Sequence, residues 1–325
     1  MLGARLINGS RRRKLLAWQA YVGNDFPEHA AKALLDLDVS FALRRLAFCR
    51  SERAVVRYMG FPGKTPLATQ LSASSYEWKT AQLRFEPRDD MPVLMAHAKA
   101  YHFLAGAQSF FNQTNRLRKI RRAGHVARQP FINWELDPLR DDTSDFEAVT
   151  RSAASANVVS LNQFQLANLC GHEAGKSNSL TNAKLQRLAL RFMKGVEVTE
   201  GVLMVVRAGD RGYLIVTKGA ETCWLPPFHE AGERDRIVDP TGAGSAFLGA
   251  LAIGYLENGD MFGACCFGVV GASFAVEQVG LPTLDADDRG QEMRNPDSVS
   301  ARLASYQVRT AHLRPARWAA TTSDQ

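Results

Sequence analysis

The chain has 325 residues and a formal net charge of +7, and 46% of its residues are hydrophobic against 22% charged, the composition of an ordinary soluble globular protein. No apolar run reaches the roughly 18 residues that a membrane-spanning helix needs, so we expect no membrane partner. Five cysteines, an odd number without a Cys-x-x-Cys pair, indicate free thiols in a reducing compartment and therefore a cytoplasmic protein.

Two basic runs, 11–14 and 116–122, raise the question of nucleic-acid binding. A basic run on a helix is usually a solvated face, and no interleaved aromatic residues or known nucleic-acid module accompany these two. Nucleic-acid binding is therefore a distant alternative.

The first third of the chain mixes helical and strand-like segments. We expect helices over 1–18 and 30–37, and strands at 20–22, 39–43 and 54–59. Pro27 suits the first turn of the second helix.

From Pro92 onward, strand signals alternate with helices. The expected strands are 100–104, 131–134, 157–161, 201–207 and 213–217. Three helices are expected: one that ends at Arg122, one that begins at Asn162 and one over 181–193. Repeated βα units predict an α/β fold with a mainly parallel sheet and helices on both faces. We expect one domain over 1–314 and a mobile tail over 315–325.

Residues 238–250 form a small-residue turn that opens directly into an apolar helix. Gly242 and Gly244 let the backbone approach a ligand, and the first N–H groups of the following helix have no intrahelical partner. With the helix dipole, these donors suit a phosphate or a developing oxyanion. Since Gly-rich turns before helices are common, a plain tight turn is the competing interpretation.

This turn resembles a signature of the PfkB/ribokinase family of carbohydrate and nucleoside kinases, carried here by Asp239, Thr241, Gly242, Ala243, Gly244, Phe247 and Gly249. The resemblance implies a ribokinase-like doubly wound fold with a small β lid, complete or incomplete, and ATP-dependent phosphoryl transfer to a sugar-like hydroxyl. It implies that the amides of Gly242, Ala243 and Gly244 form the anion hole, and that Asp239 helps to hold a monovalent cation such as K⁺. Capping of the turn at Thr241 is the alternative role of Asp239.

Other segments extend this resemblance to about residues 2–285. Asp25-Phe26-Pro27 and Trp134-Glu135-x-x-Pro138 are similar to the fungal, maintenance-of-killer-like branch of the family, whose members also carry Asp-Pro-Thr-Gly at the signature. The stretch 205–212 resembles the family's strand and turn on the nucleotide side. The resemblance implies that the nucleotide and its metal are bound by Arg207, Gly209, Gly212, Thr241, Asn162 and Gln165.

Several positions depart from the family pattern. Ser245 stands where the family has its Asp base, and a hydroxyl needs a partner that deprotonates it before it can act as a base near neutral pH. Gln165 replaces the Glu of an Asn-x-x-Glu motif that organises Mg²⁺, which removes a charge that favours the ion. Capping of a helix by Asn162, with Gln165 at the surface, is the alternative. The segment 2–6 resembles the middle of the family's first helix, so we expect the first strand, with its substrate-binding Asp, to be missing.

No other residue offers an evident base. His97, His102 and His125 are scattered without metal-ligand spacing, and Ser245 has no partner base that the sequence identifies. The hypotheses are therefore a PfkB-type kinase of weak or absent activity that uses ATP and Mg²⁺, and a pseudokinase that binds a nucleotide or a metabolite phosphate. The sequence predicts no oligomeric state.

Overall fold

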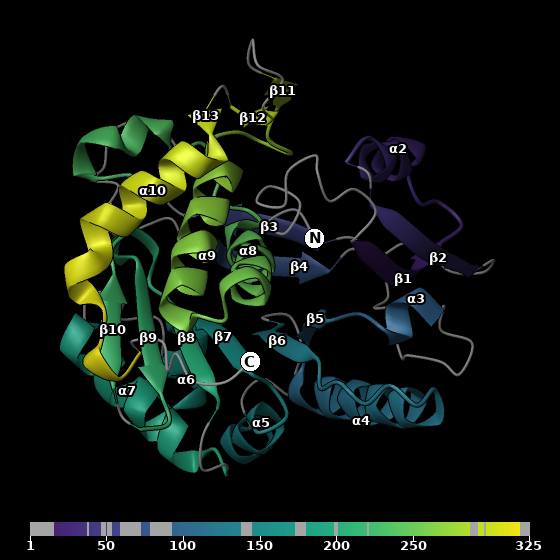
Figure 1. Ribbon diagram of the computed structural model, residues 1–325, viewed down its shortest axis with the longest axis horizontal. Coiled ribbons are helices and arrows are strands. Elements are labelled where there is room, and N and C mark those ends of the chain that lie inside the picture. Colours follow the sequence, from purple (N-terminus) through teal and green to yellow (C-terminus); the bar gives the residue numbers. More distant parts are fainter. Residues whose placement is uncertain are drawn as a thin grey trace.

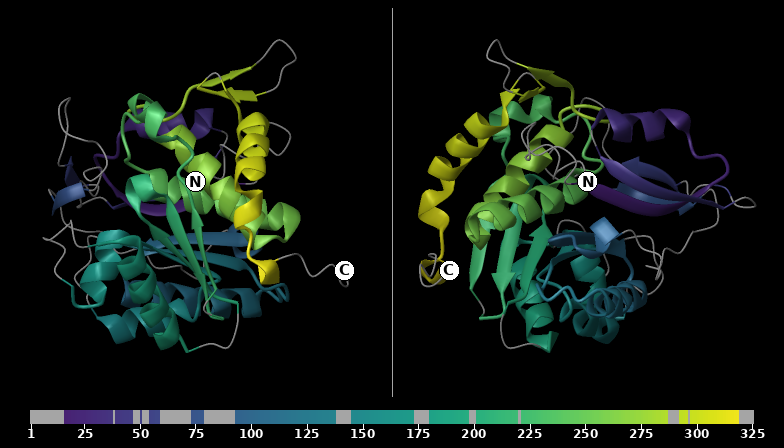
Figure 2. Two further views of the ribbon diagram at one scale, coloured as in Figure 1. Left: turned by 90° about the vertical axis from the view of Figure 1, so that its left-hand side faces the viewer. Right: turned by 45° about the vertical axis from the view of Figure 1, so that its right-hand side comes forward.

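The computed structural model describes residues 16–37, 39–46, 50, 54–58, 73–78, 93–137, 145–172, 180–197, 201–219, 221–286, 292–295 and 297–318. Helices lie on both sides of a central sheet, as Figure 1 and Figure 2 show. This arrangement confirms the predicted α/β fold with a mainly parallel, doubly wound sheet.

Six strands form the central sheet, in the order β10-β9-β8-β7-β6-β5. Their bounds are Ala100–Ala105 for β5, Phe131–Leu136 for β6, Val158–Asn162 for β7, Leu203–Arg207 for β8, Tyr213–Thr217 for β9 and Thr222–Leu225 for β10. β5 to β8 run parallel, whereas β9 and β10 pair antiparallel at one edge. Every residue of β6 is buried, as expected for a parallel strand that is covered on both faces.

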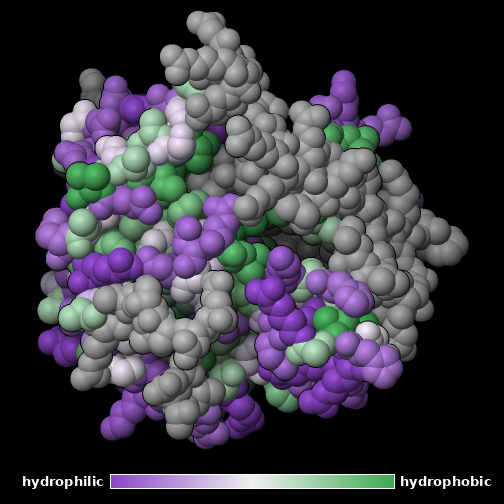
Figure 3. Space-filling model, viewed as in Figure 1, coloured by the Kyte–Doolittle hydropathy of each residue, from purple (hydrophilic) through white to green (hydrophobic). Residues whose placement is uncertain are grey.

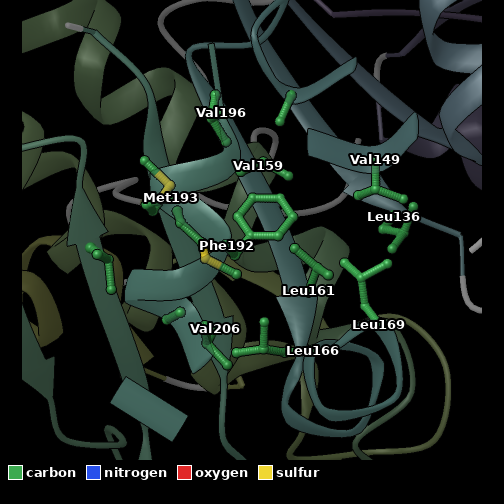
Figure 4. Close-up of a cluster of buried hydrophobic side chains, with 14 of the residues drawn as sticks. Leu136, Val149, Val159, Leu161, Leu166, Leu169, Phe192, Met193, Val196 and Val206 are labelled. Atoms are coloured by element: carbon green, nitrogen blue, oxygen red, sulfur yellow. The ribbon is translucent and has the colours of Figure 1, made fainter. Parts of the chain in front are cut away.

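Four helices pack on one face of the sheet: α4 (Ala107–Ala123), α5 (Phe146–Ala153), α6 (Gln163–Leu169) and α7 (Asn182–Gly195). They share this face because right-handed crossovers between strands in sequential order all pass over the same side. Figure 4 shows the apolar core beneath them, where Phe192 and Met193 of α7 meet Val159 and Leu161 of β7 and Val206 of β8.

The opposite face carries α8 (Ala243–Asn258), α9 (Met261–Ala275) and α10 (Val299–Thr310). Every residue of α9 from Phe262 to Ala275 is buried, which is why this helix is apolar all round. A Cβ at Gly268 would stand 2.8 Å from the ring of Phe247, so the glycine lets α8 and α9 pack closely. This packing holds α8, and with it the signature turn, against the carboxyl end of the sheet.

The N-terminal segment forms small separate sheets. β1 (Ala17–Gly23) and β2 (Ser40–Leu46) are parallel and are linked by α2 (Glu28–Asp36), while β3 (Ala54–Tyr58) and β4 (Ala73–Trp78) are antiparallel. They lie beside the main body in the right-hand view of Figure 2. A helix was expected over 1–18, but residues 17 and 18 belong to β1, so this end of the prediction is wrong. Residues 1–15 lie outside the described part of the chain.

The C-terminal segment continues past α10. β11 (Leu284–Ala286), β12 (Glu292–Arg294) and β13 (Asp297–Ser298) form a three-stranded sheet before α10, and short 3₁₀ helices cover Ala311–Leu313 and Ala316–Trp318 after it. Trp318 packs edge to face against Phe262, with ring centroids 6.5 Å apart. The predicted mobile tail therefore includes an ordered turn at 316–318, whereas 319–325 lie outside the described residues.

The basic run of α4 is less exposed than the sequence suggests. Lys119 and Arg122 face solvent, and Figure 3 shows hydrophilic residues over this side of the molecule. Arg121, however, is only 5% exposed and donates hydrogen bonds to the carbonyls of Ala96, Ala98 and Arg128. The other basic run, 11–14, lies outside the described residues.

Two further sequence expectations concern the thiols and the membrane. Four of the five cysteines, Cys170, Cys223, Cys265 and Cys266, are buried free thiols, as expected, and Cys49 lies outside the described residues. Among the helices that the structure describes, none is long and apolar enough to cross a membrane.

Candidate active site

The signature turn ends in a helix N-terminus with free donors. Gly242 has φ 80°, the left-handed conformation that glycine adopts without steric cost, and α8 begins at the next residue. The N–H of Ala243 donates to the carbonyl of Pro240 at 3.2 Å. Within the described part of the chain, the N–H groups of Gly244 and Ser245 have no hydrogen-bond partner. These two amides and the helix dipole can hold an anion.

A buried carboxylate faces this helix terminus. Glu135 lies near the carboxyl end of β6, and Ser245 on the first turn of α8 donates a hydrogen bond of 2.6 Å from Oγ to its Oε2. Arg207, the last residue of β8, donates from Nη1 to Oε1 at 2.5 Å. His102 of β5 places Nε2 3.2 Å from Oε2. Three parallel strands and one helix thus converge on a single carboxyl group.

The surroundings keep Glu135 ionised. Its side chain is only 7% exposed, and burial by itself would raise its pKa. The positive charge of Arg207 and the hydrogen bonds from His102 and Ser245 outweigh burial and hold the pKa well below its usual range. The group is therefore a carboxylate that accepts hydrogen bonds at neutral pH.

Arg207 lies directly against the signature helix. A Cβ built on Gly244 would overlap Nη1 of Arg207 and would stand 3.0 Å from Oε1 of Glu135, so only a glycine leaves room for the ion pair. Nε of Arg207 is buried and has no hydrogen-bond partner among the described residues. The predicted nucleotide contact at Arg207 is, in this structure, the ion-pair partner of Glu135.

Asn162 and Gln165 form a capping box at the start of α6. Oδ1 of Asn162 accepts from the N–H groups of Phe164 and Gln165, and Oε1 of Gln165 accepts from the N–H of Asn162 at 2.7 Å. Nε2 of Gln165 also donates to the carbonyl of Leu136 at 2.9 Å. The geometry matches the capping alternative for Asn162, but Gln165 is half-buried and bonded rather than a free surface side chain.

The remaining predicted residues lie in the turns around the site. Oδ1 of Asp239 accepts from both N and Oγ1 of Thr241, the turn capping that was the alternative role of Asp239. Gly209 and Gly212 have φ 64° and 84° in the turn between β8 and β9. In the described part of the chain, no three His, Cys, Asp or Glu side chains come together in a way that could hold a metal ion.

Sequence reasoning missed two residues of this cluster, and the view that Ser245 lacks a partner was wrong. Glu135 is that partner, and His102, which had seemed isolated, lies beside it. A signal did exist. His102, Glu135 and Arg207 each lie in or at the end of a predicted strand, and parallel strands in sequential order bring their carboxyl ends to one edge of the sheet, where ligands bind.

Known proteins of two kinds, a family and several solved structures, are similar to this chain. The family described as pfkB family carbohydrate kinase matches residues 68–287, which is more than half of the chain. Among solved structures, Giardia lamblia ribokinase has a TM-score of 0.63 at 13% identity, over 86% of this chain and 81% of its own. Arabidopsis thaliana ribokinase in complex with ribose and ATP has a TM-score of 0.61 at 16% identity, over 93% of this chain and 84% of its own. These likenesses support the ribokinase-like fold.

The curated relatives include fungal proteins. An uncharacterized protein of Schizosaccharomyces pombe is 25% identical over 94% of this chain and 83% of its own length. The protein MAK32 of Saccharomyces cerevisiae is 24% identical over 88% of this chain and 77% of its own length. Both findings agree with the fungal branch that the short motifs indicate. The family match over 68–287 shows that the chain belongs to the PfkB family of carbohydrate kinases.

Proposed function

We propose that this protein transfers the γ-phosphoryl group of ATP to a hydroxyl of a sugar-like small molecule. The observation that carries the proposal is the N-terminus of α8, where the free amides of Gly244 and Ser245 lie beside the Glu135 carboxylate. Family membership supports the choice of ATP and of a carbohydrate acceptor. A segment that is 35% identical to Arabidopsis thaliana inositol 3-kinase, over 29% of this chain, adds cyclitols to the acceptors worth testing.

The site supplies what phosphoryl transfer needs most. The transition state is loose, with charge spread over the equatorial phosphoryl oxygens, so catalysis depends on positioning and electrostatic stabilisation. The amides of Gly244 and Ser245 would meet this charge together with the positive end of the α8 dipole. The N–H of Ala243 is already bonded to Pro240 and contributes less.

The described residues fit a nucleotide phosphate better than a protein-held metal. Mg²⁺ is usually bound through one or two carboxylates together with substrate phosphates. Asn162 and Gln165 are both engaged in the capping box and present no charge, so we assign no step to a metal held by them. A monovalent cation at Asp239 stays a prediction, because one of its carboxylate oxygens already accepts two hydrogen bonds from Thr241.

A second function is favoured by one observation. The guanidinium of Arg207 is paired with Glu135 and covers the side of the first helical turn at Gly244. In a pseudokinase, a protein that binds a nucleotide or a metabolite phosphate without turnover, the ion pair between Arg207 and Glu135 would stay formed. We rank it second, because among the described residues no group accepts from the N–H groups of Gly244 and Ser245.

The test is ADP release from ATP with Mg²⁺ in the presence of ribose, fructose, adenosine or myo-inositol, with mass spectrometry of the products. We expect ADP release that depends on one of these acceptors, and a phosphorylated product. ATP binding without release of ADP for any acceptor would instead support the pseudokinase.

A further inference from the structure

The hydroxyl of Ser245 is arranged as a proton donor to Glu135. A serine hydroxyl has one O–H donor and two acceptor lone pairs. Its proton points to Oε2 of Glu135 at 2.6 Å, and in the described part of the chain no second hydrogen bond engages this oxygen. The lone pairs of Oγ are therefore available to the proton of another hydroxyl at the helix terminus.

Glu135 is held so that it can take the proton that Ser245 releases. Arg207 binds Oε1, while His102 and Ser245 both approach Oε2. This division leaves the side chain with little freedom to turn, since its two oxygens have different partners on different strands. Because the pKa of Glu135 lies below its usual range, the carboxyl group is ionised before each reaction cycle.

We propose that Glu135 is the proton acceptor of this kinase and that it acts through the hydroxyl of Ser245. This inference rests on the proposed phosphoryl transfer. The O–H bond of the acceptor breaks and its proton passes to Oγ of Ser245, while the serine's own proton passes to Oε2 of Glu135. A bond forms between the acceptor oxygen and the γ-phosphorus, and the bond from that phosphorus to the bridging oxygen breaks, so that ADP leaves with the electron pair.

His102 and Arg207 are positioning residues in this scheme. Arg207 fixes Oε1 and keeps the second oxygen directed at the helix, and His102 shares Oε2 with Ser245. The ion pair with Arg207 also makes Glu135 a weak base, because protonation leaves the guanidinium without its counter-charge. Because positioning and electrostatic stabilisation supply most of the catalysis of phosphoryl transfer, a weak base suffices for slow turnover.

The decisive experiment compares Glu135→Gln with the double variant Glu135→Gln/Ser245→Asp, by ADP release from ATP with Mg²⁺ and the acceptors named above. We expect Glu135→Gln to lower kcat about 100-fold or more with little change in the KM for ATP. In the double variant, a carboxylate stands at position 245 itself and takes the proton directly, so kcat recovers at least about tenfold. Glu147→Gln, an exposed glutamate of α5, is the matched control and keeps kcat unchanged.

A purely structural Glu135 would behave differently. The double variant would then be as inactive as Glu135→Gln even when both unfold at the same temperature, and that result overturns the proposal. Unchanged kcat in Glu135→Gln overturns it as well. Absence of ADP release from the unaltered protein with every acceptor would overturn the proposed function together with this inference, so the two failures are distinguishable.

Glu135→Gln leaves Arg207 without its counter-ion and could prevent folding. Ser245→Ala and Ser245→Thr keep the ion pair and provide the second test. We expect Ser245→Ala to lose kcat to a similar extent as Glu135→Gln, and Ser245→Thr, which keeps a hydroxyl, to lose much less. Equal kcat in these two variants would contradict a role for the hydroxyl.

Discussion

Two buried glutamates of this protein, Glu135 and Glu277, have similar partners but different surroundings. Each has an arginine and a histidine within 3.3 Å, and their side chains are 7% and 8% exposed. Glu277, after the end of α9, accepts from Arg302 through both oxygens, at 2.9 and 3.0 Å, and also contacts Arg236 and Asn295. Both of its oxygens are thus held by groups of the protein.

Glu135 differs because one of its partners belongs to a helix terminus with free donors. Ser245 connects it to the unpaired amides of α8, and Arg207 binds only one of its oxygens. At Glu277, Arg302 instead lies 3.9 Å from the centre of the Phe274 ring and ties α10 to α9. A buried acid with an arginine therefore does not by itself indicate a catalytic group; the hydrogen bond of Glu135 to the first turn of α8 is what supports its proposed role.

The largest effect we expect is a loss of stability in Glu277→Gln, whereas Glu135→Gln should lose kcat. Glu277→Gln removes one of the two carboxylates that pair with the buried Arg302, while Asp297 remains, so the free energy of unfolding should fall by about 3 kcal/mol, the lower end of the range for broken buried ion pairs. Its kcat per folded molecule should stay unchanged, in contrast to Glu135→Gln. Urea unfolding and ADP release measure the two quantities. A loss of kcat in folded Glu277→Gln would contradict the view that only Glu135 contributes to catalysis.

The fold was more predictable from the sequence than the site. Strands such as 131–134 and 213–217 are short apolar segments, and the small-residue signature at 239–249 indicates its own turn and helix. The partners of Glu135 come from positions 102, 207 and 245, which only the tertiary structure brings together. Their meeting depends on strand order and on how α8 packs over β6, and neither is encoded in local spacing. For the same reason, the sequence could not show that Arg121 turns inward.

The next prediction compares the two ends of α8. Gly242 and Gly259 both adopt left-handed conformations, with φ 80° and 65°, and, apart from their chain neighbours, no atom of the described residues lies within 4 Å of a Cβ built at either position. Gly242→Ala and Gly259→Ala should each lower the free energy of unfolding by about 1–2 kcal/mol, the cost of that conformation for a residue with a Cβ. Only Gly242→Ala should also weaken ATP binding, as titration calorimetry would show. Equal ATP affinities in the two variants would indicate that the anion is bound elsewhere.

The unaltered protein and Glu135→Gln should differ in how the free energy of unfolding depends on pH in acid. Because the pKa of Glu135 is lowered in the folded state, its contribution to stability is fully present above the unfolded pKa of about 4.3 and is lost as the pH falls toward the folded value. The free energy of unfolding of Glu135→Gln should therefore depend less on pH below about 5. Identical pH dependences would contradict the ionised state of Glu135.

The smallest expected effect concerns His229, the histidine near Glu277. Burial lowers its pKa, so the unfolded chain takes up a proton first as the pH falls. The stability that this residue contributes is present above the unfolded pKa of about 6.5 and declines as the pH falls below it. His229→Gln should remove this decline between about pH 7 and 5 in thermal melting. If the stability of His229→Gln declines as much as that of the unaltered protein, other groups cause the decline.

Isothermal titration of the purified protein with ATP, with and without Mg²⁺, tests the kinase assignment most directly. If the α8 terminus holds a nucleotide phosphate, we expect binding with a Kd in the range of micromolar concentrations, about −8 kcal/mol. The Gly242→Ala variant should bind more weakly than Gly259→Ala under the same conditions. No binding at millimolar ATP, in the presence or absence of Mg²⁺, would contradict both phosphoryl transfer and nucleotide sensing by this protein.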